Sequence, residues 1–124
     1  MNSATERGEF IRVSEPETGI WVLRLNRPEV MNAWHGPMRA ELAQVMNEIA
    51  TSDARVVIFR GDEKSFSAGE DVRGMAGLTQ GGTKNFRAIA RQIHAAFDLV
   101  ESVEVPVIAA IEGVAAGGGM ELAL

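Results

Sequence analysis

Apolar positions recur with two different periods along this chain, and the change of period separates predicted strands from predicted helices. They alternate with polar positions over residues 9–15 and 19–25, around the turn-forming segment Glu15-Pro-Glu-Thr-Gly19, which predicts a β-hairpin. Residues 37–51 follow Gly36-Pro37 with helical spacing, and residues 85–103 show the same spacing. The apolar faces of these two predicted helices consist of Met38, Leu42, Val45, Met46 and Ile49, and of Phe86, Ile89, Ile93, Ala96, Phe97 and Val100.

Two short apolar runs, residues 55–60 and 105–111, lie between turn formers and predict buried strands. Residues 74–83 hold four glycines and predict a mobile loop, and residues 118–124 favour the start of a further helix. The resulting order, ββ-α-β-loop-α-β-α, predicts strand–helix–strand units with right-handed crossovers and a largely parallel sheet. We therefore expect the strands at 55–60 and 105–111 to lie side by side.

A glycine-rich turn follows each of these two strands, and each turn has an acidic residue close by. The segment 113–121 reads Gly-Val-Ala-Ala-Gly-Gly-Gly-Met-Glu, and the segment 64–73 reads Lys-Ser-Phe-Ser-Ala-Gly-Glu-Asp-Val-Arg. A strand, a glycine turn and a helix start expose backbone N–H groups to a ligand oxygen. Either turn alone is more often a plain structural turn. Together they can each offer one N–H to a single carbonyl oxygen, at the sheet edge where α/β proteins bind ligands.

Three motifs in this chain resemble those of the crotonase family of enoyl-CoA hydratases and isomerases. Phe66-Ser-Ala-Gly-Glu-Asp71 is similar to the family's FxAGxD motif, and Ile111 to Leu122 is similar to its second oxyanion motif, including the hydratase glutamate. Leu25-Asn-Arg-Pro-Glu-Val-Met-Asn-Ala33 resembles the early LNRPxxxNA signature. The resemblance implies an α/β fold, the crotonase (ClpP-like) spiral of ββα units with a largely parallel sheet, truncated after the second oxyanion turn. Residues 1–124 would be the N-terminal portion of a single domain.

The resemblance also implies roles for individual residues. The backbone N–H groups of Glu70 and Gly118 would form the oxyanion hole, and Glu121 would handle the water or a proton. Many family members carry a small residue at position 70, so we expect the Glu70 side chain to point away from the oxyanion. The positions implied to contact the substrate are Ala33, Ala68, Gly69, Asp71, Val72 and Gly117.

Simpler interpretations stand beside several of these roles. From spacing alone, Glu121 is a solvated glutamate in the first turn of a helix, and Asp71 is expected to cap a short helix. His35 and His94 are expected to have structural or solvent-facing roles. Trp21 is interpreted as core, Trp34 as a pocket wall, and Met75 as either tunnel lining or core filler. Arg27 and Arg73 are either ordinary surface arginines or contacts for the phosphates of coenzyme A.

The favoured function is enoyl-CoA hydration, in which an acyl-CoA thioester is the substrate and no cofactor is needed beyond the coenzyme A it carries. A double-bond isomerase would use the same amide pair. A fragment that only binds the thioester is a third possibility, because the family's second acid/base carboxylate would lie beyond Leu124. A Clp-like hydrolase would need a serine at the second turn, and Ala-Gly-Gly-Gly-Met supplies none. A dinucleotide-binding fold is disfavoured because no GxGxxG motif follows the first strand.

Amino-acid composition disfavours several other classes of protein. The 124 residues are 46% hydrophobic and 23% charged, near the average for soluble globular proteins, and form one domain or part of one. The net charge of −5 disfavours a nucleic-acid binder, and the lack of cysteine excludes disulfides and thiolate metal sites; no metal site is predicted. Without an apolar run of about 18 residues or an apolar signal segment, we expect a cytoplasmic protein that does not insert into membranes. The resemblance implies a homotrimer or hexamer at full length.

Overall fold

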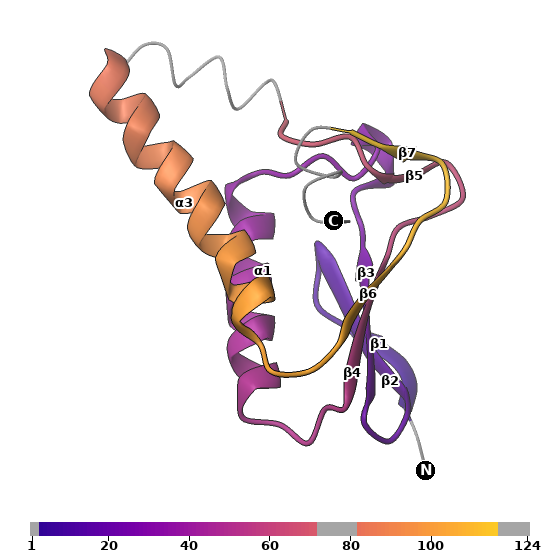
Figure 1. Cartoon of the computed structure of the whole chain (residues 1–124). Coiled ribbons are helices and arrows are strands. Elements are labelled where there is room, and N and C mark those ends of the chain that lie inside the picture. Colours follow the sequence, from indigo (N-terminus) through magenta and orange to yellow (C-terminus); the bar gives the residue numbers. More distant parts are fainter. Residues whose placement is uncertain (1–2, 72–81, 117–124) are drawn as a thin grey trace.

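The central feature of the fold is a mixed sheet whose strand order is β1-β2-β3-β4-β6. The computed structural model describes residues 3–71 and 82–116, and within them five strands form this sheet (Figure 1). The first three strands pair antiparallel, and β4 and β6 then add in parallel. Their bounds are β1 Ser3–Arg7, β2 Ile11–Glu17, β3 Ile20–Leu25, β4 Val56–Arg60 and β6 Val107–Ala110.

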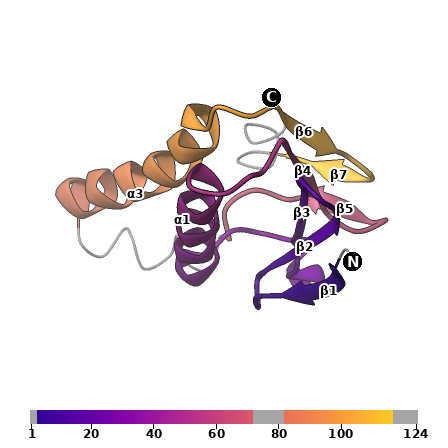
Figure 2. The ribbon, with the colours of Figure 1, turned by 90° about the horizontal axis from the view of Figure 1, so that it is seen from below.

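Two long helices, α1 (Gly36–Ala50) and α3 (Gly82–Ser102), lie on the same face of the sheet (Figures 1 and 2). All five apolar positions predicted for the first helix are buried in α1. In α3, Ala96 and Val100 are buried and Phe97 packs against the core, whereas the side chains of Phe86 and Ile89 lie outside the described part. The N-terminal half of α3 projects beyond α1 in both views. Neither helix is apolar enough over a sufficient length to cross a membrane.

The strands bury one face and leave the other more open. The prediction of a fully buried strand at 105–111 is therefore wrong, and the buried strand predicted at 55–60 is buried on one face only. In β4, Val57 and Phe59 are buried while the neighbouring positions are only partly covered. In β6, Val107 and Ala109 pack against the core, but the side chain of Ile108 is 51% exposed. The cause is that both helices cover the same face, and successive strand residues point to opposite faces. A continuous apolar run does not distinguish this arrangement from burial on both sides.

The predicted parallel neighbours are confirmed, because Val57 to Arg60 pair with Val107 to Ala110. The segments that follow β4 and β6 then cross from the main sheet into a second, two-stranded sheet that the sequence did not predict. Here β5 (Ser65–Ser67) pairs in parallel with β7 (Val114–Ala115). These strands are too short to show a periodicity, and their partners are distant in sequence. The second sheet keeps these two segments side by side up to Ala116, whose N–H donates to the Ser67 carbonyl at 3.0 Å.

Other boundaries differ by a few residues. Strand β1 was not predicted, a short 3₁₀ turn, η1 (Pro28–Val30), follows β3, and the hairpin turn tightens to Thr18 and Gly19. The predicted loop at 74–83 loses its last two residues to α3. Its other residues, and the predicted helix at 118–124, lie outside the described residues.

Gly113 is the crossing point between β6 and β7, and it tests this architecture. Its φ is +69°, and a Cβ there would clash with the Lys64 carbonyl group. We expect Gly113→Ala to lower the free energy of unfolding by about 2–4 kcal/mol, because a left-handed conformation costs about 1–2 kcal/mol and the clash adds to it. The measurement is chemical denaturation. Gly36→Ala is the matched control, since no atom lies within 4 Å of its added Cβ, and an equal loss in both variants would contradict the crossing.

Candidate functional site

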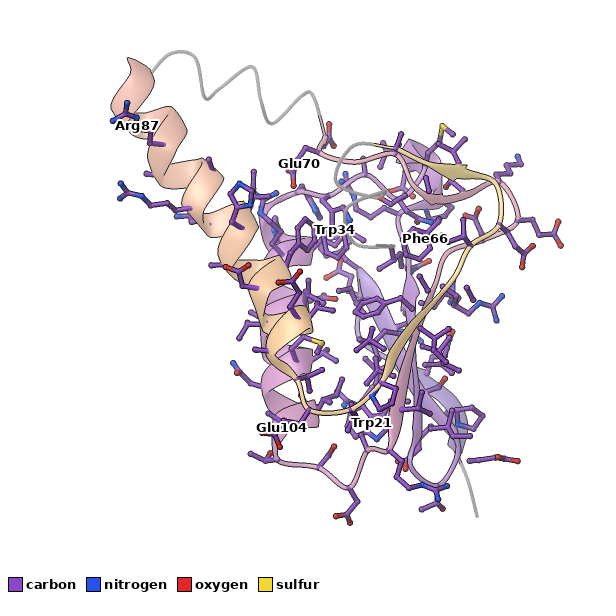
Figure 3. The ribbon with its side chains drawn as sticks, viewed as in Figure 1. Trp21, Trp34, Phe66, Glu70, Arg87 and Glu104 are labelled. Atoms are coloured by element: carbon purple, nitrogen blue, oxygen red, sulfur yellow. The ribbon has the colours of Figure 1, made fainter. Side chains whose placement is uncertain are left out.

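The candidate site lies where the chain leaves β3 and β4, at the end of the sheet that also carries Trp34, Phe66 and Glu70 (Figure 3). Residues 31–34 and 68–71 run alongside each other there. The Ala68 N–H donates to the Met31 carbonyl at 2.9 Å and the Trp34 N–H to the Gly69 carbonyl at 2.7 Å. The Asp71 N–H donates back to the Trp34 carbonyl at 2.8 Å. Two of the sequence motifs, LNRPxxxNA and FxAGxD, are therefore in direct backbone contact.

The Asn32 side chain joins these two motifs. It is fully buried, with a φ of +56°, a left-handed conformation that asparagine adopts more readily than most residues. Its Oδ1 accepts from the Arg27 N–H at 2.7 Å, and its Nδ2 donates to the carbonyls of Ser65 and Phe66, both at 3.2 Å. The Ser67 hydroxyl donates to the Asn32 carbonyl at 2.8 Å. The conformation of the FxAGxD turn thus depends on a side chain from the earlier motif.

A buried ion pair makes a second link between the motifs. Arg27 is 7% exposed; its Nη1 donates to the Ala33 carbonyl at 2.6 Å, and its Nη2 lies 3.2 Å from Oδ2 of Asp71. Both ways in which the sequence analysis interpreted Arg27, as a surface arginine and as a contact for coenzyme A phosphates, are therefore wrong. The reason is that the guanidinium is enclosed and already held by partners within the fold. Arg73, the other arginine considered, lies outside the described residues.

The Glu70 amide faces away from Trp34. Glu70 and Trp34 form a parallel bridge in which Trp34 bonds to the Gly69 carbonyl and the Asp71 N–H. Peptide groups alternate in direction along an extended segment, so the N–H of Glu70 points to the opposite side. Three residues earlier, at Ser67, β7 flanks the same segment, and the Ala116 N–H donates to the Ser67 carbonyl. Gly69, with a φ of +98°, makes this turn possible without steric cost.

The Glu70 carboxylate lies against α1. Its Oε2 accepts from Nη1 of Arg39 at 2.6 Å, and the two side chains are 19% and 14% exposed. Its Oε1 is buried and bonds to none of the described residues. Burial raises the pKa of Glu70, although Arg39 opposes that shift. The sequence analysis did not identify Arg39, because an arginine on the polar side of a helix looks like any surface charge.

The residues beside the turn have structural roles. His35 caps α1 by accepting the Met38 N–H on Nδ1 at 3.4 Å, and its ring meets the edge of Phe10 at 4.5 Å, which confirms its predicted structural role. Trp34 was expected in a pocket wall, and this is wrong. It is fully buried in the core, with Phe97 edge-on at 5.4 Å, because the backbone bonds of Trp34 hold it beneath α1 and α3. Trp21 packs against the same core with part of its ring exposed, and His94 is exposed on α3.

The described residues bring together five of the predicted site positions: Ala33, Ala68, Gly69, Glu70 and Asp71. Ala33 and Gly69 are buried, and the other three are half-buried. Val72, Gly117, Gly118 and Glu121 lie outside the described residues, as do Arg73 and Met75. The predicted helix cap at Asp71 concerns residues from 72 onward, and therefore stays a prediction.

Removing the Asn32 amide should weaken the whole turn. We expect Asn32→Ala to lower the free energy of unfolding by about 3–5 kcal/mol, since each buried group left without a partner costs about 1–3 kcal/mol. Asn47→Ala, at an exposed position on α1, is the control and should change stability by less than about 0.5 kcal/mol. Denaturant melts of both variants make the comparison, and similar small losses would show that the network is not needed.

His35 should make stability depend on pH. Burial, followed by the nearby charge of Arg27, lowers the pKa of His35 below its ordinary value of 6.5. Just below pH 6.5, the folded state then binds fewer protons than the unfolded state. The contribution of His35 to the free energy of unfolding is therefore fully present above pH 6.5 and is lost as the pH falls through the lowered pKa. His35→Asn keeps a capping acceptor and should flatten this dependence between about pH 5 and 7. The control is His94→Asn, and equal pH slopes in both variants would contradict the assignment.

Known proteins resemble this chain along most of its length. Residues 15–124 match the family model described as enoyl-CoA hydratase/isomerase. The chain is 35% identical over 114 residues to the crotonyl-CoA hydratase of Syntrophomonas wolfei, covering 90% of this chain and 43% of that protein. It is 32% identical over 120 residues to the fatty acid oxidation complex subunit alpha of Shewanella oneidensis, covering 94% and 17%. The chain thus spans less than half the length of these relatives.

Solved structures share the fold. An enoyl-CoA hydratase/carnithine racemase from Magnetospirillum magneticum superposes with a TM-score of 0.89 at 35% identity, covering 98% of this chain and 46% of that chain. An enoyl-CoA hydratase from Bacillus anthracis gives 0.85 at 33% identity, covering 93% and 44%. The crotonase fold predicted from the three motifs is confirmed by these superpositions. The chain belongs to the enoyl-CoA hydratase/isomerase family.

Proposed function

We propose that the protein carrying this chain is an enoyl-CoA hydratase that adds water across the 2,3-double bond of an acyl-CoA thioester. The observation that carries the proposal is the orientation of the Glu70 amide, which points away from Trp34 in a segment that β7 flanks at Ser67. The chain continues from β7 through Ala116 into Gly117 and Gly118, the second predicted amide donor. The alignment of the two segments at Ser67 and Ala116 supports a shared acceptor between them. The hydratase relatives support the reaction class.

The two amides would act on the thioester oxygen. When the oxygen of water bonds to C3 of the substrate, the electrons of the double bond move toward the thioester carbonyl, and its oxygen becomes an enolate-like oxyanion. Hydrogen bonds from Glu70 N–H and Gly118 N–H strengthen as this charge develops, so they stabilise the transition state more than the bound substrate. Each such donor is typically worth about 2.7–4 kcal/mol.

Glu121 would act as the general base. It takes a proton from the attacking water while the C–O bond forms, and that proton is passed on to C2 as the enolate collapses, which returns Glu121 to its carboxylate form. Water and the thioester supply every atom of the product with no net oxidation or reduction, so no redox cofactor is needed, and no metal is proposed. Coenzyme A enters as part of the substrate. The substrate contacts proposed for Ala33, Ala68, Gly69, Asp71, Val72 and Gly117 follow from the family motifs.

Two other activities would use the same amide pair. A double-bond isomerase would move a proton between carbons of the acyl chain and would release no hydrated product. A binding module would hold the thioester without turnover. Assays with a 2-enoyl-CoA and a 3-enoyl-CoA separate the three, because only a hydratase converts the first to a 3-hydroxyacyl-CoA. The cytoplasmic location and the homotrimeric or hexameric assembly stay predictions from the sequence and its family resemblance.

Replacement of Glu121 tests the mechanism in the enzyme expressed from its complete reading frame. We expect Glu121→Gln to lower kcat for crotonyl-CoA hydration by about 10²–10⁴-fold, the usual contribution of general base catalysis. Binding of a saturated acyl-CoA should persist, because the amide donors do not depend on this side chain. Glu112→Gln, at an exposed carboxylate before Gly113, is the control. Unchanged turnover in Glu121→Gln would remove that residue from the mechanism.

A further inference from the structure

We propose that Arg39 is a positioning residue, which holds the Glu70 carboxylate against α1 and so keeps a negative charge away from the oxyanion bound by the Glu70 amide. The inference rests on the proposed function. It concerns a conflict within one residue, because Glu70 supplies an amide donor to a developing negative charge and also carries a negative charge of its own. The structure offers a physical solution to that conflict.

The contact between the two side chains is short and shielded. Nη1 of Arg39 lies 2.6 Å from Oε2 of Glu70, and neither side chain is more than one-fifth exposed. Arg39 lies in the first turn of α1 and reaches 31 residues along the chain to this partner. Arg39 also lines a groove of about 320 Å³ between α1 and α3, whose other lining residues are mostly apolar. Since only 14% of its side chain is exposed, Arg39 is covered by neighbouring residues as well as paired by charge.

The other charges near Glu70 do not replace Arg39. Asp71 follows in the chain, and its negative charge disfavours an ionised Glu70. Arg27 is already held by Asp71 and the Ala33 carbonyl. Without Arg39, the mostly buried carboxylate of Glu70 would have no cation among the described residues in contact with it, so it would either take up a proton or turn elsewhere.

The Glu70 side chain could rotate toward the oxyanion that its own amide would bind. In an extended segment the side chain leaves the backbone roughly at right angles to the peptide N–H, so the present rotamer separates the carboxylate from the amide's acceptor. A rotamer change alone would take the carboxylate away from Arg39 and could turn it toward an oxygen bound by that amide. A like charge brought closer to the oxyanion opposes it more strongly.

A purely structural role for the pair makes a different forecast. If Arg39 only ties α1 to the turn, its loss would lower stability or the number of intact sites, and removing Glu70 as well would not restore turnover per site. If Arg39 positions the carboxylate, the damage comes from Glu70 itself. Removing that carboxylate in the Arg39 variant would then recover activity. The two roles differ in the sign of the second mutation's effect.

The experiment is a double-mutant cycle in the enzyme expressed from its complete reading frame, with crotonyl-CoA as substrate. We compare wild type, Arg39→Met, Glu70→Ala and the double variant, and express kcat per site counted by titration with a saturated acyl-CoA. Arg39→Met should lower kcat about tenfold with little change in KM, less than the roughly 100-fold loss that follows removal of an oxyanion donor. The double variant should regain most of that loss. Arg7→Met, which breaks the more exposed ion pair to Glu48, is the matched control and should leave kcat unchanged.

Three results would overturn the inference. Unchanged kcat in Arg39→Met would show that the carboxylate does not need to be held. A loss that Glu70→Ala fails to reverse would make the pair structural. If the wild-type enzyme hydrates no 2-enoyl-CoA, the proposed function is wrong, and the inference fails with it. This result is distinct from the other two. If Arg39→Met does not fold, Arg39→Gln is used instead. A neutral amide holds the carboxylate more weakly than a guanidinium, so a smaller loss of kcat is expected, which Glu70→Ala should again reverse.

Discussion

The buried Asn32 side chain is the interaction on which the site depends. It satisfies backbone groups of two segments that are more than thirty residues apart, and its own left-handed backbone lets it reach both. A buried polar group of this kind is costly if any partner is lost, so the network admits few alternative arrangements. The turn at Gly69 and Glu70 therefore inherits its geometry from a motif that never has to touch the reacting atoms.

The sheet supplies the second constraint. Parallel pairing places β4 and β6 side by side. A sharp turn follows each strand, and the two segments then pair again in the small β5–β7 sheet. At Gly113 the approach to the Lys64 carbonyl is so close that no side chain fits. The two segments stay aligned up to Ser67 and Ala116. The proposed pairing of two amides on one oxygen depends on that alignment.

Under the proposed function, glutamate at position 70 is an unfavourable side chain beside an oxyanion, and the fold accommodates it. An amide donor belongs to the backbone and survives any substitution, but its direction and the charge around it do not. The pair with Arg39 directs the carboxylate toward α1, while Arg27 and Asp71 neutralise one another on the other side of the turn. Among the described residues, the charges near the amide thus form two ion pairs.

The sequence by itself determined the helices, the hairpin, the parallel neighbours and the family, because these depend on local periodicity and on short motifs with fixed spacing. It also located the turn at Gly69 and favoured a structural or solvent-facing role for His35, whose capping contact only the structure shows. Only the tertiary structure decided what long-range contacts set: the second sheet at β5 and β7, the open face at Ile108, the burial of Arg27 and Trp34, and the pairing of Arg39 with Glu70. A sequence pattern reports which residues favour burial or a given period. It does not report which distant residue pairs with a charged side chain or hydrogen-bonds to a peptide group, since that follows only from packing in three dimensions.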